Sequence, residues 1–336
     1  MSVETVRVGS VFGLRDILVA RRNLGNILRK TPLQHSFLLS QRVGSEVYLK
    51  SENLQRTGAF KVRGAINKIA SLSPEERATG VVAASSGNFA LGVAYAARVL
   101  GGVPVSLFMP VNTPTSKLDK LGEFEVDVFL AGETYEEAHD ASIEFQREHG
   151  LTYAHTYDDP LVVAGQGTVG LEIMQELPDA EALLVPIGGG GLIAGISVVA
   201  KAVNSEIKII GVQPEASPAA YLSLKAGRCY ERYEASPTIA EGLAGGFGVV
   251  PFRIARDLID EVVLVNEEEI REAIFALLEA EQLVVEGSGA VGVAALLFDK
   301  VNLRGGKVVA VISGGNIDVD LLFEVLGECW QRRRGE

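Results

Sequence analysis

The sequence predicts an α/β protein with two domains, in which helices cover parallel sheets on both faces. The chain has 336 residues, and a single hydrophobic core stops growing at about 250–300 residues, so two domains are expected. Short apolar runs alternate with glycine-containing turns and helical patterns, which is typical of parallel βαβ units. These runs lack polar alternation, as expected for strands that are covered on both faces.

The expected strands and helices follow one another in a regular order. Five apolar runs are each followed by a helical pattern, and they lie at 81–84, 104–110, 125–131, 183–187 and 208–214. A further strand is expected at 307–312. Ligands of open α/β sheets bind beyond the carboxyl ends of the strands, so the glycine turns are the place to look for chemistry. The stretch 156–168, which is polar and then glycine-rich, is the best candidate for a crossover between the domains.

Composition argues against several classes of protein. The net charge is −12, which disfavours a nucleic-acid-binding protein and offers no polybasic segment for a membrane surface. Cys229 and Cys329 lie far apart, without a CxxC pair or a Cys/His cluster, so neither a disulfide framework nor a zinc site is expected. The N-terminus lacks a long apolar run and does not resemble a secretion signal. We therefore expect a cytoplasmic protein.

One turn contains four consecutive glycines, which follow an expected strand and open a helix: Gly188, Gly189, Gly190 and Gly191. Their N–H groups are free of side-chain obstruction, and the helix dipole adds positive charge, so this turn suits a phosphate group. The spacing matches neither the P-loop nor the dinucleotide-binding fingerprint. A tight turn packed against the sheet is the alternative, but four glycines cost considerable chain entropy.

A second turn, SSGNF, also joins an expected strand to a helix. Ser85, Ser86 and Gly87 would present N–H groups and hydroxyls to a carboxylate. Asn88 could hydrogen-bond a neutral or anionic oxygen. An ordinary helix N-cap is the alternative interpretation of these residues.

Lys61 stands behind a turn at Thr57 and Gly58 and beside the large apolar side chain of Phe60. Most lysines are solvated, but burial here would lower the pKa of the amine and favour the neutral form that Schiff-base chemistry needs. Ser313, in ISGGN near the C-terminus, could cap a ring nitrogen, with a plain turn as the alternative. Together these features are what pyridoxal phosphate (PLP) and an amino acid demand from a protein.

The chain resembles the threonine/serine dehydratase and serine racemase family of the fold-type II PLP enzymes, which have the tryptophan synthase β-like fold. The resemblance covers about residues 15–325 and rests on an ordered set of motifs: LQRTGAFKVRGA, SSGNFALGVA, AGQGTVGLEI, IGGGGLIAG, TIAEGL, EGSGA and SGGN. It implies two open, twisted α/β domains with the cofactor in the cleft between them. The large PLP-binding domain would comprise residues 1–52 and 157–336, and the small mobile substrate-binding domain residues 53–156. A homodimer is also implied.

The resemblance implies a role for each matching residue. The cofactor-binding residues would be Phe60, Lys61, Asn88, Gly188, Gly189, Gly190, Gly191, Glu286 and Ser313. The substrate carboxylate would be bound by Ser85, Ser86 and Gly87, with Asn88 beside them. Lys61 would hold PLP as a Schiff base and exchange protons at the substrate Cα. Asn88 would bond the cofactor's 3′-oxygen, Ser313 would face its ring nitrogen, and Glu286 would lie near the ring or only order its loop.

The implied reaction is the β-elimination of a β-hydroxy amino acid, above all L-threonine or L-serine, to a 2-oxo acid and ammonia. Lys61 would remove the α-proton. The β-hydroxyl would then leave, protonated in the family's usual scheme by the cofactor phosphate. A serine rather than an aspartate opposite the ring nitrogen would leave that nitrogen largely unprotonated. The short-lived carbanion that results suits elimination better than transamination.

Some positions depart from the family's usual pattern. Phe89 replaces a histidine, Ala59 a serine and Gly287 a proline. These changes remove polar groups near the site, so a larger or more apolar pocket and a bulkier substrate such as phenylserine form one alternative. Ser86 keeps open another, an amino-acid racemase with side dehydratase activity, because racemases of this family use a serine there as a second acid/base. A cap that only binds carboxylate is the other role for Ser86.

Some relatives also bind a divalent metal after the strand that matches 208–214. Here Gln213 and Ala219 stand where carboxylates would be wanted, so no strong metal site is expected. Two further classes of function are weighed against the dehydratase. Lys61 argues against a metabolite-binding protein without catalysis, and the glycine spacing argues against a dinucleotide-binding oxidoreductase.

Overall fold

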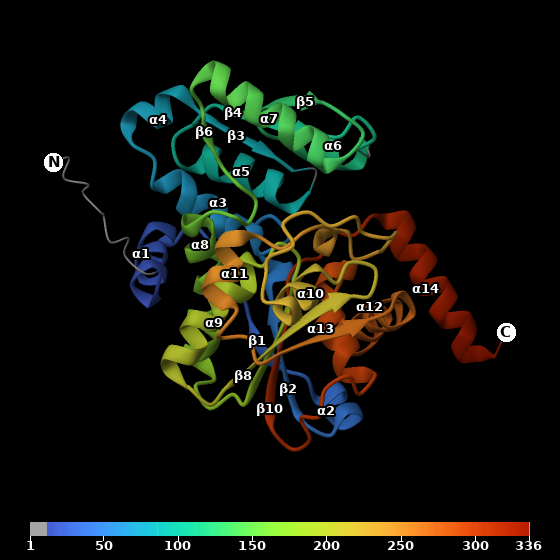
Figure 1. The fold of residues 1–336 in the computed structure, drawn as a ribbon. Coiled ribbons are helices and arrows are strands. Elements are labelled where there is room, and N and C mark those ends of the chain that lie inside the picture. The colour runs from blue at the N-terminus through green and yellow to red at the C-terminus, as the bar shows by residue number, and fades with distance from the viewer. Residues whose placement is uncertain (1–11, 86, 114, 336) are drawn as a thin grey trace.

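The computed structural model describes residues 12–85, 87–113 and 115–335, and these form two sheets with helices on both faces (Figure 1). Among these residues the larger sheet has six strands in the order β1-β2-β10-β7-β8-β9, and the smaller has four in the order β5-β4-β3-β6. All the neighbouring strands pair in parallel except β1 and β2, which are antiparallel at the sheet edge. The predicted α/β class is confirmed.

The strands lie close to the positions that the apolar runs predict. The larger sheet contains β1 (Leu33–His35), β2 (Glu46–Ser51), β7 (Ala182–Pro186), β8 (Lys208–Pro214), β9 (Glu261–Val265) and β10 (Lys307–Ile312). The smaller sheet contains β3 (Val81–Ala84), β4 (Val105–Met109), β5 (Asp127–Leu130) and β6 (Thr152–Tyr153).

The helices alternate with these strands along the chain. The first seven are α1 (Leu14–Leu24), α2 (Phe37–Val43), α3 (Lys61–Ala70), α4 (Pro74–Thr79), α5 (Asn88–Val99), α6 (Thr115–Leu121) and α7 (Tyr135–His149). They are followed by α8 (Pro160–Glu176), α9 (Gly191–Val203), α10 (Ala219–Ala226), α11 (Val249–Ala255), α12 (Glu267–Glu281), α13 (Gly287–Leu297) and α14 (Val319–Arg334). Two short 3-10 helices are η1 (Glu52–Leu54) and η2 (Glu241–Leu243). In the part of the chain that the structure describes, no helix combines the length and apolar character that a membrane span requires.

Strand β10 in the middle of the larger sheet shows how that sheet is covered. Val308 and Ala310 belong to a core that also contains residues of α12 and α13. Val309 and Val311 point the other way and belong to a second core with residues of α8 and α9. Because both faces are buried, the strand needs no polar alternation, as its sequence predicts.

The smaller sheet is covered in the same manner. Val81 and Ala83 of β3 pack with residues of α3 and α5. Val82 and Ala84 face the opposite side, where they pack with residues of α7. The smaller sheet and its helices form the upper part of the molecule in Figure 1, and the larger sheet forms the lower part.

The stretch 156–168, predicted as a crossover, joins β6 of the smaller sheet to a buried helix. Helix α8 begins at Pro160, and the Asp159 side chain caps it by accepting the Leu161 N–H at 2.7 Å. The glycines of this stretch lie inside α8, where the absence of a side chain allows the backbone of neighbouring helices to approach closely. A Cβ on Gly165 would lie 2.5 Å from the carbonyl oxygen of Arg63 in α3. The division into domains of residues 1–52 with 157–336 and of residues 53–156 stays a prediction.

Candidate active site

A cavity of about 890 Å³ opens beside the turns that follow β3, β7 and β10. The carboxyl ends of these strands lie at its edge, as the rule for open α/β sheets predicts. The predicted residues that line it are Phe60, Lys61, Ser85, Gly87, Asn88, Gly188, Gly189, Gly190, Gly191, Glu286 and Ser313. Ser86 lies outside the described residues. The structure therefore brings together side chains that are up to 253 positions apart in the sequence, from Phe60 to Ser313. What each of them does stays a prediction.

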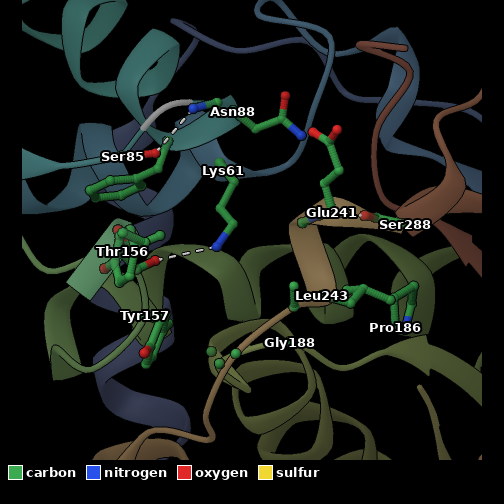
Figure 2. A pocket seen from close by; sticks show the side chains of 18 of the residues that line it. Lys61, Ser85, Asn88, Thr156, Tyr157, Pro186, Gly188, Glu241, Leu243 and Ser288 are labelled. Carbon is green, nitrogen blue, oxygen red and sulfur yellow. Dashed lines mark hydrogen bonds between the residues drawn. The ribbon is translucent and has the colours of Figure 1, made fainter. Parts of the chain in front are cut away.

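Lys61 is the first residue of α3, and its side chain crosses the cavity toward Thr156 (Figure 2). Its amine donates a long hydrogen bond of 3.5 Å to the Thr156 carbonyl oxygen. Its Nζ lies 5.3 Å from the centre of the Phe60 ring. Burial lowers the pKa of the Lys61 amine to about 8, and the charge of Glu286 opposes that shift. A large fraction of this amine is therefore in the nucleophilic, neutral form near pH 8.

The loop in front of Lys61 is fixed to the end of β10. The Phe60 N–H donates to the Ser313 carbonyl oxygen at 3.0 Å, and the Gly315 N–H donates to the Gly58 carbonyl oxygen at 2.9 Å. Gly58 has a φ of +75°, and a Cβ there would lie 2.7 Å from the Asn316 side chain. These contacts explain why a glycine is needed at this turn. They also set the direction in which Lys61 enters the cavity.

The four-glycine turn presents unused hydrogen-bond donors to the cavity. None of its N–H groups donates to another described residue, and the turn leads into the 13-residue helix α9. A row of N–H groups without protein partners at a helix N-terminus suits an anion. Protein packing also demands glycine here. A Cβ on Gly189 would lie 2.1 Å from the Tyr157 ring, and Gly190 has a φ of +90°.

The described residues of the SSGN turn, Ser85, Gly87 and Asn88, line another side of the cavity at the N-terminus of the 12-residue helix α5. Ser85 is buried, and its hydroxyl accepts the Gly87 N–H at 3.4 Å. A Cβ placed on Gly87 would meet no atom within 4 Å, so the backbone there is open to a ligand. The helix N-terminus and this open backbone together suit a carboxylate.

Asn88 connects two other cavity residues by hydrogen bonds. Its Nδ2 donates to Glu286 Oε1 at 2.7 Å, and its Oδ1 accepts from Asn316 Nδ2 at 2.7 Å. Asn316 Nδ2 also donates to the Thr57 carbonyl oxygen at 2.8 Å. Burial raises the pKa of the Glu286 carboxyl to about 7, although the hydrogen bond from Asn88 opposes this. Glu286 therefore changes its charge near neutral pH.

Comparison with known proteins agrees with this geometry. The family model described as pyridoxal-phosphate dependent enzyme matches residues 25–314. The chain belongs to this family.

Individual members of the family are similar over nearly the whole chain. The L-threonine ammonia-lyase of Thermotoga maritima is 50% identical over 316 residues, which cover 94% of this chain and 78% of that protein. The catabolic L-threonine dehydratase TdcB of Escherichia coli is 40% identical over 315 residues, which cover 93% of this chain and 95% of that protein. The structure of maize serine racemase matches with a TM-score of 0.87 at 32% identity and covers 96% of this chain and 99% of that one. The predicted family and its fold are confirmed.

The residues present fit the cofactor of this PLP-dependent family. Its phosphate requires several donors, and the free N–H groups of the glycine turn supply them. Its aldehyde requires a neutral amine, and the lowered pKa of Lys61 provides one. Ser313 is buried and donates to the Ser288 carbonyl oxygen at 3.3 Å. Facing a ring nitrogen would require that hydroxyl to turn toward the cavity, so this role stays a prediction.

The departures from the family pattern add little apolar surface to the cavity. Ala59 is fully buried, and a Cβ on Gly314 would lie 3.1 Å from the Ala59 Cβ. Phe89 touches the cavity but is only 1% exposed, because it packs into the core beneath α5. A Cβ on Gly287 would lie 2.3 Å from the Ile239 carbonyl oxygen, which explains the glycine by close approach of backbone. The expected enlargement of the pocket gains no support from these contacts.

Some residues of the cavity wall are not among the predicted site residues. His155 and Tyr157 line the cavity just after the two-residue strand β6, where no glycine turn marks a site. Asn316 and Leu243 also line it. Both lie at the ends of quoted motifs, SGGN and TIAEGL, so the order of the motifs is the signal that could have found them.

The end of β8, where no strong metal site is expected, carries a glutamine that hydrogen-bonds neighbouring backbone. Gln213 is buried, donates to the Ile187 carbonyl oxygen at 3.1 Å and accepts the Tyr221 N–H at 2.9 Å. It thus ties the end of β8 to helix α10. Within the described ranges, no group of three or more His, Cys, Asp or Glu side chains is placed to hold a metal ion.

Proposed function

We propose that this chain is a PLP-dependent L-threonine ammonia-lyase that also acts on L-serine. It converts the β-hydroxy amino acid to a 2-oxo acid and ammonia. The observation that carries the proposal is the joint placement of Lys61, the glycine turn and the SSGN turn around one cavity. This placement occurs in a chain that is 50% identical to an L-threonine ammonia-lyase.

Each part of the cavity has a task in this reaction. PLP supplies an aldehyde for amine exchange and a ring that stabilises negative charge at the substrate Cα. Gly188, Gly189, Gly190 and Gly191 bind its phosphate through their N–H groups, and Phe60, Asn88, Glu286 and Ser313 surround its ring. Ser85, Ser86 and Gly87 bind the substrate carboxylate and so orient the Cα proton. The Lys61 amine, kept partly neutral by burial, removes that proton.

An amino-acid racemase is the second candidate. The structural similarity to maize serine racemase, with a TM-score of 0.87, favours it. The identity of 32% to that protein is lower than the 50% to the ammonia-lyase, so the lyase is the better supported activity. A dehydratase for a bulkier substrate such as phenylserine is a further variant of the proposal, which the buried Phe89 and Ala59 do not favour.

We further propose a cytoplasmic homodimer with a mobile domain of residues 53–156. Cys229 and Cys329 are free thiols, as is usual in a reducing compartment. The exposed side chains of Val319 and Phe323 on α14, at 79% and 81%, are apolar surface that a second subunit could cover. Light scattering coupled to gel filtration measures the mass in solution, and a monomer at micromolar concentration would contradict the dimer.

The first experiment assays 2-oxo acid and ammonia together from L-threonine, L-serine and phenylserine. We expect equal amounts of both products, with L-threonine and L-serine preferred. Lys61→Ala should lower turnover by at least about 100-fold, because it removes the base. Lys30→Ala, which removes a lysine that is 60% exposed, is the matched control. Chiral analysis of the L-serine reaction separates the candidates, since D-serine as the main product would overturn the lyase.

A further inference from the structure

The segment 155–157 forms a wall of the cavity between the SSGN turn and the glycine turn. It continues β6, and the Ala154 N–H donates to the Val82 carbonyl oxygen of β3 at 2.9 Å. The Thr156 hydroxyl donates to the Ala84 carbonyl oxygen at 3.2 Å, next to the SSGN turn. At the other end, the Tyr157 ring occupies the space beside Gly189. His155 therefore lies on the wall that joins the carboxylate side of the site to the phosphate side.

The protein backbone fixes the proton of the His155 ring. Its Nδ1 accepts the Asp158 N–H at 2.9 Å and lies 3.3 Å from the Tyr157 N–H. A nitrogen that accepts these bonds carries no proton, so the neutral ring holds its proton on Nε2. Among the described residues no group hydrogen-bonds Nε2, while the side chain lines the cavity. This N–H is consequently available to a ligand.

His155 can bind an oxygen but cannot supply a proton to it at neutral pH. Burial lowers the pKa of the imidazole to about 4, and the neighbouring His139 and Lys61 add to the shift. The ring of Tyr157 packs edge-on against it with centroids 4.7 Å apart, so the imidazole is held in place. A neutral imidazole donates a hydrogen bond without adding charge to the site.

One substituent of the proposed substrate has no partner among the residues assigned so far, and this wall is free to contact it. Under the proposed function its amine would join the cofactor aldehyde, its Cα proton would face Lys61, and its carboxylate would be bound at the positive end of α5 at Ser85 and Gly87. The side chain is then the fourth substituent of the Cα, and we place it against the part of the wall at His155 that the other three do not use. Because the carboxylate already has a site at the positive end of α5, the neutral N–H of His155 remains for a neutral oxygen, the hydroxyl of that side chain.

We propose that His155 is the residue that selects β-hydroxy amino acids, by donating a hydrogen bond from Nε2 to the substrate's β-hydroxyl oxygen. This inference rests on the proposed function and names the group that recognises its substrate class. His155 would hold the oxygen while the Cβ–O bond breaks, and the proton with which the hydroxyl leaves as water would come from the cofactor phosphate that the glycine turn would hold, as in the family's usual scheme.

The decisive comparison uses substrates with and without the hydroxyl. In 3-chloro-L-alanine chloride leaves without a proton, so an enzyme of this class can eliminate it without any contact to a hydroxyl group. His155→Phe should lower kcat/KM for L-serine and L-threonine by about 10-fold or more. It should lower kcat/KM for 3-chloro-L-alanine by less than about 3-fold. His155→Asn, which restores an N–H donor, should recover part of the loss for the hydroxyl substrates only.

Further measurements separate recognition from structure. Tyr153→Phe alters the same aromatic cluster by removing a hydroxyl that lies 3.3 Å from the Ser142 hydroxyl. It should leave kcat/KM unchanged for the hydroxyl substrates and for 3-chloro-L-alanine. His155→Leu repeats the test with a differently shaped side chain if the phenylalanine variant folds poorly. Nitrogen-15 NMR of histidine-labelled, cofactor-free protein should show the neutral Nε2–H form from pH 5 to 8.

Two results would overturn the role of His155. One is an equal loss on hydroxyl and chloro substrates, which would assign the residue to the fold or to the carboxylate. The other is a charged imidazole at pH 7. Failure of the proposed function is separate, because the unchanged protein would then release no 2-oxo acid from L-serine or L-threonine.

Discussion

Lys61 carries its amine at the N-terminal end of a helix, inside a cavity and with only a long hydrogen bond to a carbonyl oxygen. Ordinary lysines have a pKa of about 10.4, whereas burial lowers the pKa of Lys61 to about 8. Because desolvation disfavours the ammonium form, the proton is lost as the pH rises through about 8, well before other lysines lose theirs.

This difference predicts selective labelling of the cofactor-free chain. A small acylating reagent reacts with neutral amines only, so Lys61 should be modified first, with a rate that rises between pH 6 and 8 and then levels off. Peptide mapping by mass spectrometry measures the rate at each lysine, and the exposed lysines of the same digest serve as the comparison. A Lys61 profile that runs parallel to theirs up to pH 10 would show that burial does not shift its pKa.

At the scale of elements, four buried charged side chains connect α3 to the larger sheet and to α8. Arg63 pairs with Glu52 at 2.7 Å and with Glu172 at 2.7 Å, and Lys50 pairs with Glu172 at 2.6 Å. Burial alone would raise the pKa of Glu172, but Arg63 and Lys50 lower it, so the carboxylate stays charged. Arg63 lies two residues after Lys61, so this network helps to hold the helix that carries the lysine.

Removing one charge should expose how much the network contributes. Glu172→Gln leaves two buried cations with one carboxylate, and we expect a loss of about 3–5 kcal/mol in the free energy of unfolding. Glu176→Gln is the matched control, because Glu176 lies one turn further along α8 and, within the described part of the chain, pairs only with the exposed Lys30. The control should cost less than about 1 kcal/mol. Urea unfolding monitored by circular dichroism measures both, and equal losses would refute the special role of the buried network.

The elements also show which features a sequence can predict. Strands β3 and β8 agree with the predicted runs 81–84 and 208–214. A short apolar run that is followed by a turn is typical of a buried strand and is too short for most helices. Helix α8 is harder to predict, because glycines are typical of loops. Gly165 is needed inside this helix because the backbone of α3 packs directly against it. Local composition cannot reveal a partner that lies 100 residues away.

The residues of the candidate site also differ in whether the sequence can predict them. The glycine turn, the SSGN turn and Lys61 can be predicted, because glycines at strand ends and motif order are visible in the sequence. His155 cannot, because its importance depends on two backbone N–H groups that fix its tautomer and on a cavity that only the folded chain creates. The same holds for the contact of Asn88 with Glu286, which joins positions 198 residues apart.

At the scale of the whole molecule, two ion pairs among the described residues involve side chains that line the cavity. Lys117 of α6 pairs with Glu241 of η2 at 2.6 Å, and Arg232 pairs with Asp140 of α7 at 3.4 Å. Each pair joins a helix beside the smaller sheet to the loop that precedes or contains η2. Exposed pairs contribute at most about 1 kcal/mol, so we expect them to favour a closed form without locking it.

The Lys117–Glu241 pair therefore predicts a modest kinetic effect. Glu241→Gln should raise KM for L-threonine by about 2–5-fold with little change in kcat, because the closed form loses one weak contact. The KM of the unchanged protein should rise with salt, which screens the pair, and that of the variant should not. The control is Glu234→Gln, because Glu234 also lines the cavity but forms no ion pair with another described residue. A variant KM that keeps the full salt response would contradict this assignment.

The attachment of the Lys61 loop to the end of β10 has a consequence during synthesis. Residues 58–60 are held by residues 313–315, which leave the ribosome about 250 residues later. Strand β10 is also inserted between β2 and β7, two strands that are made long before it. A nascent chain thus cannot complete its cofactor pocket until residues 313–315 have been made.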